Sequence, residues 1–364
     1  MVISENLGRS AIPIFKPKLP VWSELKTYLE KIDENGWYSN YGPLSTSVES
    51  RIADYCGMQS SQIVTVANAT LALEGALSTH LESGIWDCPA WTFAATPSAL
   101  SRSSKEFRFV DIDGEWRIAA PAKETLNKFV VDVLPFGAAV NINRFESHVE
   151  TILVDAAASF DSLRDLNLST GKQIGIVLSF HATKSLPGGE GAVFISNDVN
   201  WVNRVRQWGN FGFSEKRSSE FVGTNSKMNE YSAAVVLASL DKWEKDKLVW
   251  EELSTWATRL TSSLGFKVQP SLSEGYVSPY WILQATPQII ERIESSFQDA
   301  MIQTRRWWGY GCHKMNAFTS IKKTDLQFTD ATALSTLGLP FFKSLTLEER
   351  DRIESALLQV GSQN

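Results

Sequence analysis

Residues whose side chains or backbone N–H groups could do chemistry follow three of the apolar segments between residues 60 and 200. Ala69 and Thr70 come after "QIVTVA", Asp155 ends "TILVD", and Ser179 and Lys184 follow "IGIVL". Short runs that are rich in Val and Ile and apolar on both faces are typical of strands buried between layers of helices. In open sheets of this kind, ligands bind outside the carboxyl ends of the strands, so we expect these residues to line one crevice.

Each of these residues also has an ordinary structural interpretation. Asn68 or Thr70 could simply cap the helix that begins there. Asp155 could be an N-cap or a surface carboxylate, and Phe93, after "GIWDCPA", could pack in a core. Lys184 could be a solvated residue at the end of a strand. The prediction of a site therefore rests on the whole set in its order and not on any one member.

The order of the set matches the requirements of pyridoxal 5'-phosphate (PLP). This cofactor needs an amine for an imine, an acid that keeps its ring nitrogen protonated, a ring to stack on, and donors for its phosphate. Lys184, Asp155 and Phe93 would supply the first three. The helix N-terminus after "QIVTVA" and the hydroxyl of Ser179 would hold the phosphate. The acid and the amine are 29 residues apart (184 − 155), which leaves room for a connection and a strand.

Composition and charge argue against several other classes of protein. The chain of 364 residues has a formal net charge of −6, so we expect neither nucleic acid nor a membrane as partner. No apolar run approaches the length of a membrane span, and the first twenty residues lack the layout of a signal peptide, so we expect a cytoplasmic protein. Three widely spaced cysteines predict reduced thiols, and four scattered histidines predict no metal site.

The alternation of apolar runs and helical patterns predicts a three-layer α/β domain. The expected strands cover residues 62–67, 84–90, 107–113, 128–136, 151–157, 174–180 and 191–196. A long helical segment over 228–264 precedes a second region, with expected strands at 266–271 and 278–287 and helices at 289–302 and 346–360. Thr346 and Glu349 fit a capping box at the start of the last helix. We expect a large domain over 1–245, with an N-terminal arm, and a small domain over 246–364.

Nearly end to end, the sequence resembles the DegT/DnrJ/EryC1/StrS family of sugar aminotransferases. The motifs that carry the resemblance include "NGWYSNYGPLSTSVES", "PAWTFAATPSAL", "VDAAASFDS", "SFHATKSLPGGEGA" and "GTNSKMNEYSAAV". The resemblance implies the type I PLP-dependent aminotransferase fold, in which helices sandwich a mostly parallel sheet beside a smaller C-terminal α+β domain. It also implies PLP as the cofactor, which takes the pyridoxamine phosphate (PMP) form during turnover.

The resemblance implies roles for the residues that match the family's motifs. Lys184 is similar to the lysine that forms the imine, Asp155 to the partner of the ring nitrogen, and Phe93 to the stacking aromatic residue. Asn225 matches an asparagine that reaches the cofactor phosphate from the partner subunit, which implies a homodimer with shared active sites. The positions that match the family's phosphate-binding residues are Ala69, Thr70 and Ser179.

One position departs from the family's pattern. Gln or His usually stands three residues after the aspartate, near the ring hydroxyl of the cofactor, and here that residue is Ala158. A water molecule or another side chain must then replace the contact. The retained Lys184 argues against the dehydratase branch of the family, in which histidine replaces the lysine.

Within the family, "SNYGPLS", "HATK" and "TRRWWGYGCH" are most similar to viosamine-type enzymes, which aminate C4 of dTDP-4-keto-6-deoxyglucose. We therefore expect a keto-sugar nucleotide as the acceptor and L-glutamate as the amino donor. A 3-keto sugar nucleotide, an eight-carbon keto-acid sugar, or a non-catalytic regulator of the same fold are the alternatives. Candidate substrate contacts, for which structural roles are also open, are His181, Arg305, Arg306, Trp307, Trp308 and His313.

Overall fold

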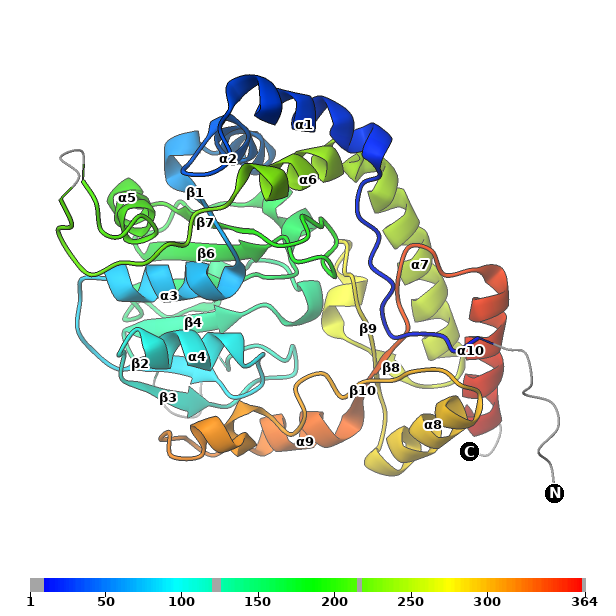
Figure 1. Ribbon diagram of the computed structural model, residues 1–364. Helices are drawn as coiled ribbons and strands as arrows, with labels where there is room; N and C mark the ends of the chain where they lie inside the picture. Colours follow the sequence, from blue (N-terminus) through cyan, green and yellow to red (C-terminus); the bar gives the residue numbers. More distant parts are fainter. Residues whose placement is uncertain (1–9, 120–125, 215–217, 362–364) are drawn as a thin grey trace.

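A seven-stranded sheet forms the centre of the larger part of the molecule (Figure 1). The computed structural model describes residues 10–119, 126–214 and 218–361, and all seven strands predicted before residue 200 are present. In the order β1-β7-β6-β5-β4-β2-β3, only β7 is antiparallel to its neighbours, so β1 points the same way as β6. The strands are β1 Ile63–Val66, β2 Trp86–Pro89, β3 Phe107–Val110, β4 Phe129–Val133, β5 Thr151–Asp155, β6 Gln173–Ser179 and β7 Ala192–Ser196.

Helices cover both faces of this sheet because its strands are apolar on both sides. Consecutive strand residues enter two separate cores, as Ile63 and Val64 do. The predicted three-layer α/β arrangement is therefore confirmed. One face is covered by α3 Ala69–Thr79, α4 Ala95–Arg102 and α5 Val199–Trp208, and the other by α2 Pro43–Cys56 and α6 Glu230–Asp241.

Side chains accept hydrogen bonds from the first N–H groups of α3, which follows β1, and of α2, which precedes it. The Asn68 side chain accepts a hydrogen bond from the Leu71 N–H at 2.9 Å, so the capping interpretation of this asparagine is correct. Helix α2 begins with proline, and the buried carboxylate of Glu230 accepts hydrogen bonds from the N–H groups of Leu44 at 2.6 Å and Ser45 at 2.9 Å. These contacts satisfy N–H groups that have no acceptor within either helix.

A three-stranded antiparallel sheet forms the second part of the molecule. The segment predicted as one helical stretch over 228–264 is two helices, α6 and α7, which meet at Lys242. The predicted capping box is present, because the Thr346 N–H donates to Glu349 at 2.8 Å and the Glu349 N–H donates to Thr346 at 3.2 Å. The elements are α7 Trp243–Ser263, β8 Lys267–Val268, β9 Trp281–Gln284, α8 Pro287–Asp299, α9 Gln327–Ser335, β10 Thr336–Leu339 and α10 Leu347–Gly361.

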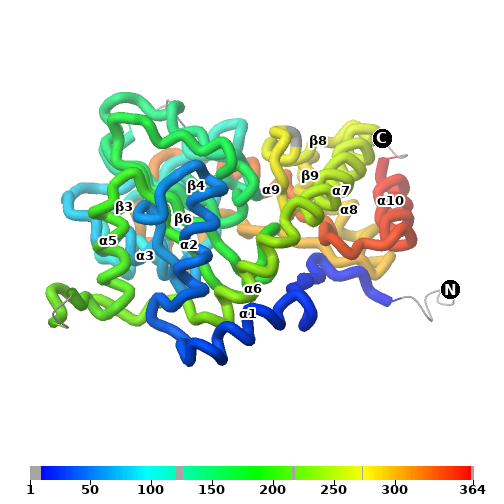
Figure 2. The backbone as a smooth tube through the Cα atoms, turned by 90° about the horizontal axis from the view of Figure 1, so that it is seen from above, coloured from blue at the N-terminus to red at the C-terminus, as the bar shows by residue number. Residues whose placement is uncertain are grey.

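Two extended segments connect the large and small sheets. The arm before α1 (Trp22–Asn35) pairs with the small part of the molecule through a parallel bridge between Ile12 and Ile302. A segment after α8 returns to the large sheet, where Lys323 forms a bridge with Phe109 on the edge strand β3. Figure 2 shows α7, α8 and α10 on the side away from α3 and α5.

The predicted domain boundary near residue 245 falls in the first turn of α7 and stays a prediction. The layout of the first twenty residues was used to predict a cytoplasmic protein. Of these, residues 1–9 lie outside the described residues. Among the helices of the described ranges, none has the length and apolar character needed to cross a membrane.

Candidate active site

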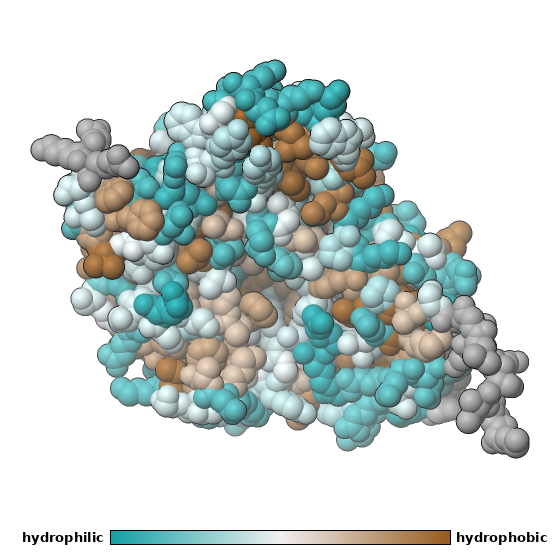
Figure 3. Space-filling model, viewed as in Figure 1, coloured by the Kyte–Doolittle hydropathy of each residue, from teal (hydrophilic) through white to brown (hydrophobic). Residues whose placement is uncertain are grey.

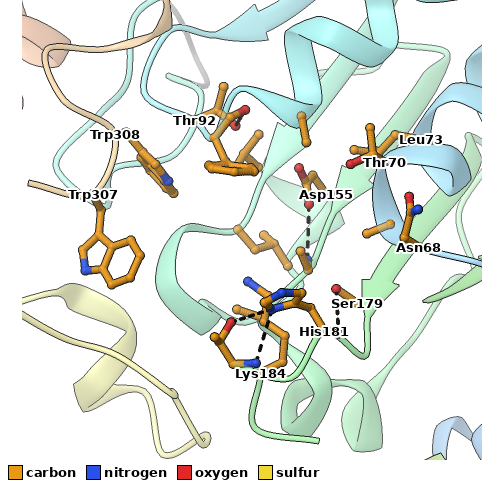
Figure 4. A pocket seen from close by; sticks show the side chains of 18 of the residues that line it. Asn68, Thr70, Leu73, Thr92, Asp155, Ser179, His181, Lys184, Trp307 and Trp308 are labelled. Carbon is orange, nitrogen blue, oxygen red and sulfur yellow. Dashed lines mark hydrogen bonds between the residues drawn. The ribbon is translucent and has the colours of Figure 1, made fainter. Parts of the chain in front are cut away.

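A cavity of about 670 Å³ lies at the carboxyl ends of the parallel strands, and the face seen in Figure 3 is hollowed between the two parts of the molecule. Figure 4 shows Asp155, Ser179, His181 and Lys184 grouped in this cavity. Trp307 and Trp308 lie on the side opposite Asn68 and Thr70. The predicted residues that line the cavity are Ala69, Thr70, Phe93, Asp155, Ser179, His181, Lys184, Arg305, Trp307 and Trp308.

The phosphate end predicted for the cavity is the N-terminus of α3. This helix begins at Ala69, directly after the turn that leaves β1, and its first N–H groups have no acceptor within the helix. The hydroxyl of Ser179, at the end of β6, accepts a hydrogen bond from the His181 N–H at 3.2 Å. Backbone donors at a helix N-terminus with a nearby hydroxyl form a suitable site for a phosphate group.

Asp155 is a buried carboxylate at the end of β5, with only 7% of the residue exposed. Burial raises its pKa, while hydrogen bonds from Thr96 Oγ1 at 2.7 Å and the Ala157 N–H at 3.3 Å, together with the charge of Lys184, act in the opposite direction. No lysine, arginine or histidine of the described ranges forms an ion pair with it. A buried carboxylate without an ion pair is stabilised by a cation placed beside it, and the protonated ring nitrogen of PLP is a suitable cation.

Lys184 lies in the loop after β6, one strand away from Asp155. Its Nζ donates a hydrogen bond to the hydroxyl of Tyr280 at 2.8 Å. The glycines that follow allow the loop to pack closely. A Cβ on Gly188 would lie 2.4 Å from Val236 of α6, and one on Gly191 would lie 2.8 Å from Met228. The loop that carries the amine is therefore fixed against α6.

Aromatic rings form the opposite wall of the cavity. Trp308 stacks on Phe136 with ring centres 4.5 Å apart, and Trp307 packs on Phe15 of the arm at 5.0 Å. Phe93 is 62% exposed at the rim, so its ring has a free face. Ala158 also lines the cavity and offers no polar side-chain atom there. This wall suits a ligand that has flat or apolar faces.

Three of the predicted residues lie outside the cavity. Arg306 pairs with Glu294 at 2.7 Å, and the ring of His313, 4% exposed, contacts Asp330 at 3.1 Å. Burial lowers the pKa of His313. This arrangement does not support a substrate contact for either side chain, because each has a structural partner elsewhere. Asn225 is exposed and outside the cavity of its own chain.

Three residues in or beside the cavity were not predicted from the sequence. Tyr280 contacts the amine, Thr96 contacts the carboxylate of Asp155, and Phe15 forms part of the aromatic wall. Tyr280 precedes β9 and Phe15 belongs to the arm, so neither follows a strand of the large sheet. Thr96, in the first turn of α4, follows the predicted Phe93 closely in the sequence. Its hydroxyl was therefore a possible candidate for the site from the sequence alone.

The fold and the cavity together define a type I PLP-dependent aminotransferase. The chain belongs to the DegT/DnrJ/EryC1/StrS aminotransferase family, whose model matches residues 22–358. The predictions of this fold, of an enzyme and of PLP as its cofactor are therefore confirmed.

The chain is similar to several individual proteins. A solved protein of Bacillus cereus ATCC 10987, assigned as a PLP-dependent aminotransferase, has a TM-score of 0.86 and 26% identity, covering 97% of this chain and 100% of that one. Protein Rv3402c of Mycobacterium tuberculosis is 30% identical over 63% of this chain and 60% of its own length. The dTDP-4-amino-4,6-dideoxy-D-glucose transaminase of Escherichia coli is 27% identical over 64% of this chain and 65% of its own length. The chain thus spans less than two thirds of these two relatives.

Proposed function

We propose that this protein transfers the amino group of L-glutamate to a nucleotide-linked keto-sugar, with PLP as its cofactor. One observation carries the proposal. The amine of Lys184 and the buried carboxylate of Asp155 follow adjacent parallel strands and face one cavity. An amine and an acid held by the same rigid sheet are two of the groups that PLP chemistry requires of a protein.

The residues of this chain then have separate tasks. The N-terminus of α3 and Ser179 would hold the phosphate, Phe93 would cover one face of the ring, and Asp155 would keep the ring nitrogen protonated. PLP, when bound, supplies an electron sink for the pair of electrons left on the α-carbon of the amino donor. Lys184, when its amine is free, would move a proton through its Nζ, from the α-carbon of the donor to the cofactor in the first half of the reaction. In the second half it would move a proton from the cofactor to the sugar carbon that gains the amino group.

The acceptor that we favour is dTDP-4-keto-6-deoxy-D-glucose, which would become the 4-amino-4,6-dideoxy sugar. The choice of dTDP and of C4 rests on the motifs and on the printed name of the Escherichia coli relative. Arg305 is a suitable contact for an anionic substrate. Its guanidinium lies over the ring of Trp307, 4.8 Å from the ring centre, and among the described residues no carboxylate pairs with it. Such products serve amino-sugar synthesis, including that of lipopolysaccharide O-antigen, and we place the enzyme in the cytoplasm.

A homodimer would complete this site. Asn225 is exposed and cannot contribute to the cavity of its own chain, so it needs a second copy in order to reach the phosphate. Two exposed aromatic residues lie together at the start of α6, a few residues along the chain from Asn225. Tyr38 is 52% exposed and stacks on Tyr231, which is 50% exposed, with ring centres 6.4 Å apart. Exposed apolar groups that lie together are typical of a protein interface.

The test uses L-glutamate labelled with ¹⁵N in its amino group and a panel of keto-sugars. The panel contains dTDP-linked and GDP-linked 4-keto-6-deoxy sugars, a 3-keto sugar nucleotide and an eight-carbon keto-acid sugar. We expect the label in the dTDP-linked 4-amino sugar, and none with the Lys184→Ala variant. If the label appears in another sugar of the panel, that sugar is the acceptor and the choice of the dTDP-linked sugar is wrong. If no sugar gains the label, the proposal is refuted.

A further inference from the structure

Tyr280 brings a hydroxyl group from the small sheet into the cavity, directly against Lys184. It lies just before β9, and only 7% of it is exposed. Its hydroxyl oxygen accepts a hydrogen bond from Lys184 Nζ at 2.8 Å, and the same Nζ lies 5.3 Å from the centre of its ring. The hydroxyl of Tyr280, from the small part of the molecule, therefore contacts the amine of Lys184, which the large part carries.

Neighbours on several sides hold the ring of Tyr280. The rings of Phe15 in the arm, Phe136 in the short turn after β4, and Trp307 have their centres 5.6, 5.5 and 5.2 Å from that of Tyr280. The backbone N–H of Tyr280 donates to the hydroxyl of Ser278 at 3.1 Å. A ring packed in this way has little freedom to move, so its hydroxyl stays in one place.

Lys184 differs from Tyr280 because its side chain is long and flexible. Its amine has three rotatable donors on a four-carbon stem. Within the described residues, Tyr280 is the one side chain to which Nζ donates a hydrogen bond. The position of the amine therefore depends on the tyrosine hydroxyl.

We propose that Tyr280 is a positioning residue that holds the Lys184 amine whenever the lysine is free of the cofactor. This inference rests on the proposed function, in which an amino donor displaces the lysine. The amine must then stay within hydrogen-bond reach of the proton that it moves. The hydroxyl keeps the amine inside the cavity, and the same position prepares it to bond to PLP with loss of water.

The Tyr280→Phe variant tests this role because it keeps the ring and removes the hydroxyl. Tyr55→Phe is the matched control. It removes a hydroxyl that donates to Asp161 at 3.0 Å, and it does not line the cavity. Two rates are measured on the full chain. The first is the rate at which PLP, added to the cofactor-free protein, gains the visible absorbance of its bond to Lys184. The second is the rate at which ordinary and α-deuterated L-glutamate bleach that absorbance.

We expect both rates to fall roughly ten- to hundredfold in Tyr280→Phe, as for the loss of a hydrogen bond to a charged group. The isotope effect should rise, because proton transfer becomes slower than the other steps, while the KM for glutamate stays unchanged. Wild-type rates in both assays, or an equal loss in Tyr55→Phe, would overturn the proposal. If glutamate fails to bleach even the wild-type protein, the proposed donor is wrong, and the rate of PLP attachment still decides the role of Tyr280.

Discussion

The hydrogen bond from Thr96 to Asp155 offers a quantitative test of the cofactor site. Thr96→Val keeps the shape of the side chain and removes the hydroxyl that donates to the carboxylate at 2.7 Å. Only the Ala157 N–H, at 3.3 Å, then remains as a donor to this carboxylate among the described residues. A hydrogen bond to a charged group contributes about 1.5–3 kcal/mol. We therefore expect PLP to bind roughly ten- to hundredfold more weakly.

The direction in which PLP affinity changes with pH can also be predicted. Burial already raises the pKa of Asp155, and the Thr96 hydrogen bond lowers it, so the substitution should raise this pKa further. The carboxylate must be charged to pair with the ring nitrogen. PLP binding should therefore weaken as the pH falls through the pKa of Asp155, and in Thr96→Val this weakening should begin at a higher pH.

The assay is a titration of visible absorbance with PLP at several pH values. Thr336→Val is a matched control, because Thr336 is buried in β10, away from the cavity, and its hydroxyl donates to a backbone carbonyl at 2.8 Å. The control should bind PLP as the wild type does. Equal PLP affinity and an equal pH profile in Thr96→Val and the wild type would refute the reasoning about Asp155.

Three further outcomes follow from the structure. Without cofactor, Asp155→Asn should be more stable than the wild type at pH 7, because a raised pKa of Asp155 destabilises the folded state only where the carboxyl is charged. In urea unfolding this difference should shrink as the pH falls and be lost below the ordinary aspartate pKa of 3.8; a constant difference would contradict this. Arg305→Ala should raise the KM for the sugar nucleotide about tenfold and leave kcat unchanged, and an unchanged KM would exclude Arg305 from the substrate site. Thr346→Ala should lower the free energy of unfolding by about 1 kcal/mol without affecting activity, whereas an unchanged unfolding curve would show that this cap adds no stability.

Most of the large sheet could be predicted because its strands have a simple pattern. Their residues are apolar on both faces, and residues such as Asp155 and Ser179 mark where β5 and β6 end. The division of the long helical segment at Lys242 had no such signal, since neither Gly nor Pro marks it. The small strand β10 was also missed, because it depends on pairing with β9 more than on its own four residues.

The candidate site could be predicted only where its residues follow strands of one sheet. Tyr280 is 96 residues from Lys184 in the sequence, and their contact depends on how the small sheet packs on the large one. His313, by contrast, was predicted to be a site residue but lies outside the cavity. Its position after "RRWWGYGC" suggested a substrate contact, but the fold turns its ring toward Asp330. Spacing along the chain does not determine such long-range packing.

The central claim is that Lys184 is the residue that bonds to PLP. The most direct measurement is borohydride reduction of the PLP-loaded protein, followed by digestion and mass mapping of the labelled peptide. We predict that the pyridoxyl label lies on Lys184 alone and is absent after treatment with excess L-glutamate. A label on another lysine, or no label at all, would contradict the account.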